Sequence, residues 1–373
     1  HMSTQGEQFL IVGAGGQTRE AVDEFFYVEE KHDGSIDIQE IILGLSYAMR
    51  SRKIDRIVAL DDFDVEKAAH LREHFRIPGM GQTTGRLFRD KLAMRMKAEE
   101  SNIHVPMFSS LFNDNDVFEF TQKVQFPCVV KPRSEASATG IRKVHNSEQL
   151  WEVVHYLGER RPEYLVEQFR PGDVYHVDSL TVGGQPIFTR CSRYLSTPME
   201  VAHGGGVFRS MTVEVGSEED LALKEMNEQV LKAFGMKFSA SHTEFIRDHA
   251  TGKFIFLETA SRVGGAHLAE MVEAATGINL WREWANVETA MARNLEYTLP
   301  EVQNMYAGIL ISLTRQRYTD PMIFDDTEVC WRMDEEFHVG AIVKSESQER
   351  VKELLDKYAQ VVFDGYHASA PVP

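Results

Sequence analysis

The sequence has 373 residues, of which 43% are hydrophobic and 26% are charged, a composition typical of a globular protein and not of a disordered or fibrous one. This length exceeds that of one ordinary domain, so we expect two or three units with separate cores. The 57 acidic residues outnumber the 40 basic ones and give a net charge of -17, which repels nucleic acid and anionic lipid at long range. We therefore expect neither nucleic acid nor a membrane surface as a partner.

Cysteine usage and hydropathy favour a reducing compartment. The three cysteines, Cys128, Cys191 and Cys330, are far apart in the sequence and form no C-x-x-C pair, so no disulfide framework is expected. No apolar run approaches the roughly 20 residues that a membrane-spanning helix needs. We therefore expect a cytoplasmic protein.

The first part of the chain alternates between apolar runs and amphipathic segments. Residues 9–13 and 56–61 are typical of buried strands, and residues 20–27 and 64–75 of helices. Strands that alternate with helices indicate a parallel α/β unit. We predict a Rossmann-like domain over residues 1–84.

Glycines follow the first predicted strand, in the run Gly13-Ala-Gly15-Gly-Gln-Thr18. Thr18 stands where a dinucleotide-binding fingerprint has its third glycine, and no convincing ribose acid follows. We therefore expect the fold of a dinucleotide-binding domain without its cofactor. The sequence also lacks G-x-x-x-x-G-K-[ST], which excludes a P-loop nucleotide site.

The rest of the chain mixes helices with short alternating strands. A helix over residues 217–234 is the clearest, because Ser217 suits its N-cap and Gly235 its C-terminal end. Residues 175–215 alternate like antiparallel strands. Further segments are predicted as helices at 91–100, 148–157, 279–293 and 348–358, and as strands at 127–132, 141–144, 164–169 and 306–313.

Two glutamates are predicted to face each other across a hairpin. Residues 242–258 contain two strand-like runs around an Asp-x-x-x-Gly turn. If the turn centres on Thr251, Glu244 lies opposite Glu258 on one face, with the two Cβ atoms about 5 Å apart. Such a pair suits a divalent cation such as Mg²⁺. A register slip of one residue would instead separate the two acids, and an exposed hairpin would leave both solvated.

Lys131 ends an apolar strand, a place that usually excludes lysine unless an anion is bound there. The small polar residues 134–140 follow it, and such a loop can fold its backbone amides over phosphate groups. The alternatives are a lysine that extends to solvent at a sheet edge and an ordinary surface loop. Together the strand, lysine and loop indicate a nucleotide lid.

These features occur in the order used by the ATP-grasp superfamily, which the sequence resembles over roughly residues 85–290. The likeness is carried by Lys91, by Lys131 with its loop, by residues 167–173, by Glu244 and by residues 258–265. Within the superfamily the sequence is most similar to carboxylate-amine ligases such as L-amino acid ligases. The resemblance implies an α/β protein, α+β in its grasp lobes: an ATP-grasp domain over residues 85–295, with a lid subdomain at about 120–175, and an α+β subdomain over 296–373.

The resemblance also implies roles for individual residues. ATP would bind Lys91, Lys131, Ser137, Glu167, Gln168, Phe169 and Asp173. Glu244 and Glu258 would bind Mg²⁺, and Arg262 and Lys131 would be the catalytic residues. Substrate would contact Arg262, Gly265, His203 and Arg209. Ala260 stands where the family usually has a metal-binding asparagine, which leaves open whether one or two ions bind.

The implied reaction is ATP-dependent formation of an amide or peptide bond through an acyl phosphate, with an amino acid expected as the carboxylate substrate. The partners would be small carboxylates and amines, and the sequence leaves open whether the chain forms a homodimer. Two other readings stay open. One is a different ATP-grasp chemistry, such as a biotin-type carboxylase or a small-molecule phosphorylating ligase, and the other is a catalytically silent nucleotide-binding protein.

Overall fold

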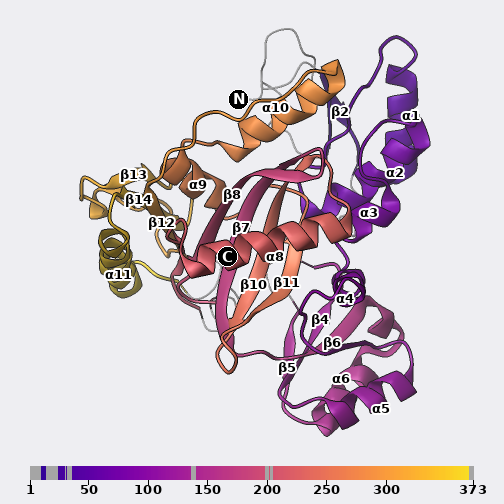
Figure 1. Ribbon diagram of the computed structural model, residues 1–373, viewed down its shortest axis with the longest axis horizontal. Helices are drawn as coiled ribbons and strands as arrows, with labels where there is room; N and C mark the ends of the chain where they lie inside the picture. The colour runs from indigo at the N-terminus through magenta and orange to yellow at the C-terminus, as the bar shows by residue number, and fades with distance from the viewer. Residues whose placement is uncertain are drawn as a thin grey trace.

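The computed structural model describes residues 10–13, 24–29, 31, 36–135, 140–197, 201 and 205–368. Two predicted site residues, Ser137 and His203, lie outside these ranges. The described strands form a two-stranded, a four-stranded and an eight-stranded sheet, flanked by helices (Figure 1). The predicted mixed α/β class is thereby confirmed. No helix in the described ranges is both long and apolar enough to span a membrane.

The described part of the N-terminal unit contains a small parallel sheet and three helices. Strands β1 (Leu10–Gly13) and β2 (Glu24–Tyr27) pair in parallel. The helices and one 3-10 turn follow as α1 (Ile38–Ala48), η2 (Asp62–Asp64), α2 (Val65–Phe75) and α3 (Gln82–Arg86). A separate buried cluster that includes Val28, Ile41 and Leu71 holds this unit together.

The four-stranded sheet forms the lobe that carries Lys131. Its order is β3-β6-β4-β5, and every neighbouring pair is antiparallel. The strands are β3 (Phe108–Ser110), β4 (Cys128–Pro132), β5 (Arg142–Val144) and β6 (Tyr164–Gln168), with α5 (Asp114–Lys123), α6 (Ser147–Leu157) and η3 (Gly158–Glu163) in the same lobe. Cys128 and Val130 share one core cluster with these helices, so Val129 and Lys131 alternate to the other face.

The eight-stranded sheet has the order β11-β10-β7-β8-β9-β12-β14-β13 and is antiparallel throughout. Its strands are β7 (Gly172–Val182), β8 (Gln185–Tyr194), β9 (Phe208–Thr212), β10 (Ser239–Asp248), β11 (Phe254–Ala260), β12 (Tyr306–Leu313), β13 (Val329–Arg332) and β14 (His338–Ser345). The associated helices are α4 (Lys91–Glu100), α8 (Glu218–Phe234), α9 (Leu268–Thr276), α10 (Leu280–Arg293) and α11 (Gln348–Gly365), with η4 (Pro321–Ile323) before β13.

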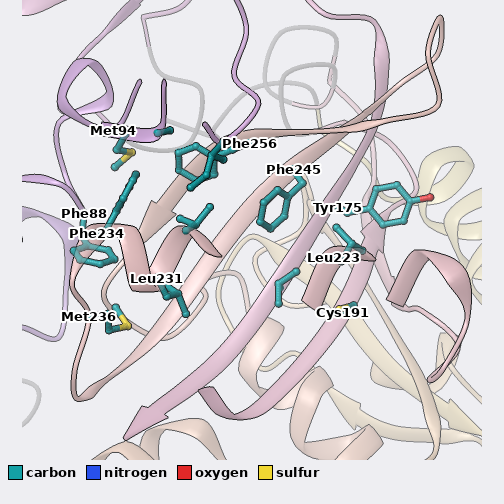
Figure 2. Packing of buried hydrophobic residues seen from close by; sticks show 14 of the residues in the cluster. Phe88, Met94, Tyr175, Cys191, Leu223, Leu231, Phe234, Met236, Phe245 and Phe256 are labelled. Carbon is teal, nitrogen blue, oxygen red and sulfur yellow. The ribbon is translucent and has the colours of Figure 1, made fainter. Parts of the chain in front are cut away.

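Helix α8 covers one face of this sheet (Figure 1). Its apolar stripe, which includes Leu223, Leu231 and Phe234, packs against Tyr175 and Phe245 from the strands, as Figure 2 shows. Side chains along a strand alternate between faces, so the even-numbered neighbours on β7 and β10 face the other side. That second face packs on α9 and α10. The sheet is thus covered on both faces, and His176 and Asp178 on the second face are completely buried.

Several predicted elements need correction. Residues 24–27, predicted as the end of a helix, form strand β2; the run Phe25-Phe26-Tyr27 is aromatic and suits a strand better than a helix. Residues 56–61, predicted as a strand, form none, and the carbonyl of Ile57 accepts a hydrogen bond from the Arg72 side chain at 2.8 Å. Helix α6 begins at Ser147, one residue before the predicted start at 148, and is capped by Asn146.

The predicted caps of α8 are confirmed. The Ser217 side chain accepts a hydrogen bond from the backbone amide of Asp220, and Gly235 ends the helix with a positive φ of 79°. Helix α11 runs to Gly365, beyond the predicted residue 358. The proposed domain boundaries near residues 84 and 295 stay a prediction.

Replacing Ser217 by alanine removes the N-cap of α8 and leaves a helix amide without its partner. We expect Ser217→Ala to lower the free energy of unfolding by about 1 kcal/mol, measured by urea denaturation followed by circular dichroism. Glu228→Ala, at an exposed position in the same helix, is the control and should change stability by less than about 0.5 kcal/mol. Equal effects of the two substitutions would show that the cap does not stabilise the helix.

Candidate functional site

The site begins with two carboxylates on neighbouring strands. Glu244 of β10 pairs with Glu258 of β11, as the sequence predicted. Nearer the turn the register is one residue shorter, since Phe245 pairs with Phe256. Leu257 is therefore the extra residue of a β-bulge, and without the bulge Glu244 would face Leu257. The bulge is what brings the two acids opposite each other.

Lys131 lies in a buried ion network on the other sheet. Its Nζ contacts Glu167 Oε1 at 2.5 Å, and Glu167 Oε2 accepts from Arg95 Nε at 2.9 Å. The three side chains are at most 5% exposed. Burial, reinforced by Arg95, lowers the pKa of Lys131 to about 8, although Glu167 opposes that shift. Burial opposes ionisation of Glu167, yet Arg95 and Lys131 lower its pKa.

Lys91 connects the two sheets. It is the first residue of α4, where its Nζ contacts Glu258 Oε2 at 2.8 Å and donates to the Glu135 carbonyl at 2.6 Å. Burial raises the pKa of Glu258, but Lys91 and Lys131 outweigh this effect and lower it to about 2. One helix thus carries Lys91 toward β11 and, one turn later, Arg95 toward Glu167 of β6.

Glu244 is held from the side by two polar groups. The Tyr194 hydroxyl donates to Glu244 Oε1 at 2.8 Å, and His242 Nε2 lies 3.7 Å from the same oxygen. Burial raises the pKa of the Tyr194 hydroxyl well above its ordinary value, and Glu244 adds to the rise. The hydroxyl therefore remains a donor, and Glu244 is fixed as an acceptor facing Glu258.

A buried Asp-His network continues beneath Glu244. Asp178 accepts from His242 Nδ1 and lies against His176 Nδ1, each at 2.8 Å, and His176 Nε2 lies 2.7 Å from Ser210 Oγ. Burial opposes the charged imidazolium of His242, but Asp178 and Glu244 raise its pKa to about 10. The pKa of Asp178 is lowered because the two histidines outweigh its burial. The network is a charged layer built into the sheet.

Gly264 lets the backbone pass close to this network. A Cβ at position 264 would lie 2.8 Å from Asp178 Oδ1 and 2.9 Å from His242 Nδ1, too close for any side chain. The backbone of Gly264, which follows Arg262 and Val263, therefore packs directly against Asp178 and His242.

Arg262 follows the end of β11 and contacts the N-terminal unit. One terminal guanidinium nitrogen forms an ion pair with Asp62 of η2, and the other donates to the Val263 carbonyl at 2.7 Å. Burial opposes the charge, but Asp62 more than offsets it, and the pKa of Arg262 is raised. Glu258 contributes to the same rise, so this cation lies within the field of the carboxylate pair.

Three of the predicted ATP contacts, residues 167–169, lie at the end of β6. Glu167 and Gln168 close this strand, and the backbone amide of Phe169 donates to the Pro127 carbonyl at 3.0 Å. The Lys143 ammonium lies 3.7 Å from the centre of the Phe169 ring. Asp173, at the start of β7, forms its ion pair with Arg193 at 3.1 Å.

The structure brings some predicted residues together and leaves others apart. Ion pairs and strand pairing join Lys131 to Glu167, Lys91 to Glu258, and Glu258 to Glu244. Arg209 instead pairs with Asp356 of α11 at 2.6 Å, within the C-terminal elements. Gly265 lies beside Arg262, since a Cβ there would be 4.0 Å from a guanidinium nitrogen. Ser137 and His203 fall outside the described ranges.

The donor set at the carboxylate pair fits Mg²⁺. Two glutamate oxygens of opposing strands are hard ligands of the kind Mg²⁺ prefers, and phosphate and water would complete its shell. Ala260 supplies no donor, so the side chains of this hairpin offer two carboxylates. The cluster His176, Asp178 and His242 also has ligand atoms within 4.8 Å of one another. Those atoms already hydrogen-bond to each other, which argues for a structural network there and not a metal centre.

Sequence reasoning missed several of these residues. Arg95 could have been found from its position four residues after Lys91 on an amphipathic helix. His242 precedes Glu244 by two and so shares its face of the strand. Asp62, Asp178 and Tyr194 left no sequence signal, because each reaches the site from a segment distant in the chain.

Part of the chain is similar in sequence to known proteins. Residues 124–270 match the family model of the ATP-grasp domain. An L-arginine-specific L-amino acid ligase of Bacillus subtilis is 25% identical over 271 residues, covering 69% of this chain and 64% of the relative. A D-alanine--D-alanine ligase of Neisseria gonorrhoeae is 23% identical over 204 residues, covering 54% and 66%. The match thus spans slightly less than two thirds of these relatives' length.

Solved structures share the fold over nearly the whole chain. An L-amino acid ligase from Bacillus licheniformis has a TM-score of 0.74 at 18% identity and covers 98% of this chain and 99% of its own. A biotin carboxylase complex from Campylobacter jejuni has a TM-score of 0.69 at 15% identity, with coverage of 97% and 86%. At these identities the likeness establishes the fold.

The charged state of His242 should make stability depend on pH. Its folded pKa of about 10 lies above the ordinary value of 6.5, so its stabilising contribution is complete below pH 6.5 and is lost as pH rises toward 10. We expect the difference in unfolding free energy between wild type and His242→Gln to shrink over that range, measured by urea denaturation at pH 6, 8 and 9.5. Exposed His145→Gln is the control. A difference that stays constant from pH 6 to 9.5 would contradict a charged His242.

Proposed function

We propose that the chain, of which residues 124–270 match the family model of the ATP-grasp domain, is an ADP-forming carboxylate-amine ligase. In this proposal ATP phosphorylates a carboxylate, and an amine then displaces phosphate to form an amide or peptide bond. An amino acid is the carboxylate substrate. The observation that carries the proposal is that two lysines act on one acid of the carboxylate pair. Lys91 contacts Glu258 directly, and the charge of Lys131 also lowers the pKa of Glu258.

The two lysines supply the charge for a triphosphate. Both are now neutralised by glutamates, Lys91 by Glu258 and Lys131 by Glu167. A phosphate chain brings oxygens that can replace Glu258 as the partner of Lys91, which releases that carboxylate for the metal. Because Lys131 is almost completely buried, its charge acts through a low dielectric and attracts an anion strongly. Glu167, pinned by Arg95, keeps the lysine in place.

Nucleotide recognition beyond the phosphates is proposed at the end of β6. Gln168 and Phe169 lie there on backbone that is hydrogen-bonded to Met107 and Pro127, which supports a rigid edge for the adenine. Asp173 remains the proposed ribose contact and would have to part from Arg193 to serve it. The small-residue loop that contains Ser137 would cover the phosphates.

Glu244 and Glu258 would hold Mg²⁺. When bound, the ion would neutralise the phosphate oxygens and stabilise charge during phosphoryl transfer. Tyr194 fixes the orientation of Glu244 by its hydroxyl hydrogen bond, so this acid is preorganised for the role. One ion is supported by the two carboxylates, and a second would need ligands other than Ala260.

Arg262 would bind and orient the carboxylate. Its planar guanidinium suits both a carboxylate and the acyl phosphate made from it. A carboxylate oxygen would attack the γ-phosphorus, and the bond to the bridging oxygen would break to release ADP. The amine nitrogen would then attack the acyl carbon, phosphate would leave, and the nitrogen would lose its proton to solvent. His203 and Arg209 remain proposed substrate contacts, and Arg209 would first have to leave Asp356.

Another ATP-grasp chemistry is the second candidate. It is favoured by the similarity in fold to a biotin carboxylase, which shows how little the fold alone restricts the acceptor. A carboxylase of that kind would release ADP with bicarbonate and would not require an amine. The substrates required for ADP release therefore separate the two candidates.

Screening ADP release with ATP and Mg²⁺ against amino acids, singly and in pairs, tests the proposal. We expect release that requires two substrates and falls at least about 100-fold in Lys131→Ala and in Glu258→Ala, since each substitution removes a charge that stabilises phosphoryl transfer. Lys123→Ala, at an exposed site in the same lobe as Lys131, is the matched control and should keep full activity. Nucleotide binding without release in any pool would favour a silent protein, and release with bicarbonate alone would favour a carboxylase.

The lowered pKa of Lys131 gives a second test. Its charged form exists below a pKa of about 8, so affinity for ATP should fall as pH rises above 8. In Lys131→Arg the guanidinium stays charged throughout, and we expect the fall to disappear even if affinity is lower overall. Calorimetric titration with a non-hydrolysable ATP analogue from pH 6.5 to 9.5 measures both. A parallel fall in wild type and Lys131→Arg would assign the pH dependence to another group.

A further inference from the structure

Asp62 and Arg262 form an ion pair between two units of the chain. Asp62 belongs to η2 of the N-terminal unit, and Arg262 follows β11 of the eight-stranded sheet. Their side chains are only 10% and 19% exposed. Two opposite charges are thus held together largely out of water, at the arginine that we propose binds the substrate carboxylate.

Asp62 has no local role that explains its charge. The N-cap of η2 is Asp61, whose side chain accepts from the Phe63 amide. Within the described residues, the Asp62 carboxylate hydrogen-bonds to Arg262 and to no other group. Among the described residues, the Asp62 carboxylate is therefore paired with Arg262 alone. If Arg262 bound another anion instead, Asp62 would be left as a buried anion without a partner. An unpaired anion is strongly unfavourable in a low-dielectric site.

The surroundings of the pair leave room on the Gly265 side. A Cβ at position 265 would come within 4 Å of Arg262 alone, at 4.0 Å from its guanidinium nitrogen. The absence of a side chain at Gly265 therefore leaves space for a ligand beside the Arg262 guanidinium.

We propose that Asp62 binds the ammonium group of an α-amino acid whose carboxylate binds Arg262. In the substrate-free chain Asp62 takes the place of that carboxylate on the guanidinium. This inference rests on the proposed function and adds the group that selects its carboxylate substrate. A zwitterion can separate the pair without leaving either charge alone, because its carboxylate pairs with Arg262 and its ammonium with Asp62.

Selectivity for an α-amino acid over other carboxylic acids follows from the need to pair both Asp62 and Arg262. A carboxylic acid without the ammonium group would pair with Arg262 and leave the Asp62 carboxylate without a partner. Sites built to bind a polar group reject analogues that lack it by large factors. We therefore expect the wild-type chain to prefer an α-amino acid over its des-amino analogue by at least about 100-fold in kcat/KM.

The experiment compares the most active amino acid from the ADP-release screen with the same acid carrying hydrogen in place of the ammonium group, at one fixed amine. In Asp62→Asn we expect the preference to fall at least about 10-fold, mainly through loss of activity on the amino acid. Asp64→Asn is the matched control, because Asp64 lies two residues away, is exposed and contacts Lys67. It should keep the wild-type preference.

Two results would overturn the inference. One is an equal loss on both acids in Asp62→Asn, which would make the ion pair a structural link between the units. The other is a wild-type chain that uses both acids equally, a result that needs no variant and holds even if Asp62→Asn fails to fold. If no carboxylate supports ADP release, the proposed function fails. Calorimetric binding of the two acids to wild type then decides the inference, which is lost if the amino acid binds no more tightly.

Discussion

Glu244 and Glu258 face each other across β10 and β11, and the repulsion between these two carboxylates determines much of what surrounds them. Two like charges at this spacing are costly unless cations lie nearby. The chain supplies Lys91 directly, and Lys131 through space, and together they lower the pKa of Glu258. Glu258 therefore stays ionised without a metal, and the same lysines become available when a nucleotide brings its own negative charge.

The cations reach this point because helix α4 contacts strands of both sheets. Helix α4 begins with Lys91 against Glu258 and buries Arg95 against Glu167 one turn later. Glu167 in turn holds Lys131 on the face of the small sheet that is turned away from its own helices. Beneath Glu244, the Asp178 network keeps charge inside a sheet that is covered on both faces. Each ion pair fixes the geometry of the next, which favours preorganisation over flexibility at the site.

Local patterns predicted part of this arrangement and missed the rest for physical reasons. The Glu244–Glu258 pairing was predicted from a turn centred on Thr251, but the strand register next to the turn is one residue shorter. The bulge at Leu257, which the sequence did not reveal, restores the predicted pairing. The caps of α8 were visible because capping is a matter of a few adjacent residues. The strand at 24–27 and the absence of one at 56–61 were missed, since both depend on partners elsewhere in the chain. The roles of Lys91, Lys131 and Arg262 came from family resemblance, whereas Asp62 and Asp178 reach the site only through tertiary packing.

The central claim is that ATP activates a carboxylate directly, and transfer of an oxygen isotope tests it. The chain would be supplied with ATP, Mg²⁺, an amine and an amino acid labelled with ¹⁸O in its carboxylate, and the released phosphate would be analysed by mass spectrometry. An acyl phosphate leaves one carboxylate oxygen on the phosphate when the amine displaces it, so the account predicts phosphate that carries one ¹⁸O for each amide formed. Unlabelled phosphate released along with the amide would contradict it, because the phosphoryl group would then have gone to some acceptor other than the carboxylate.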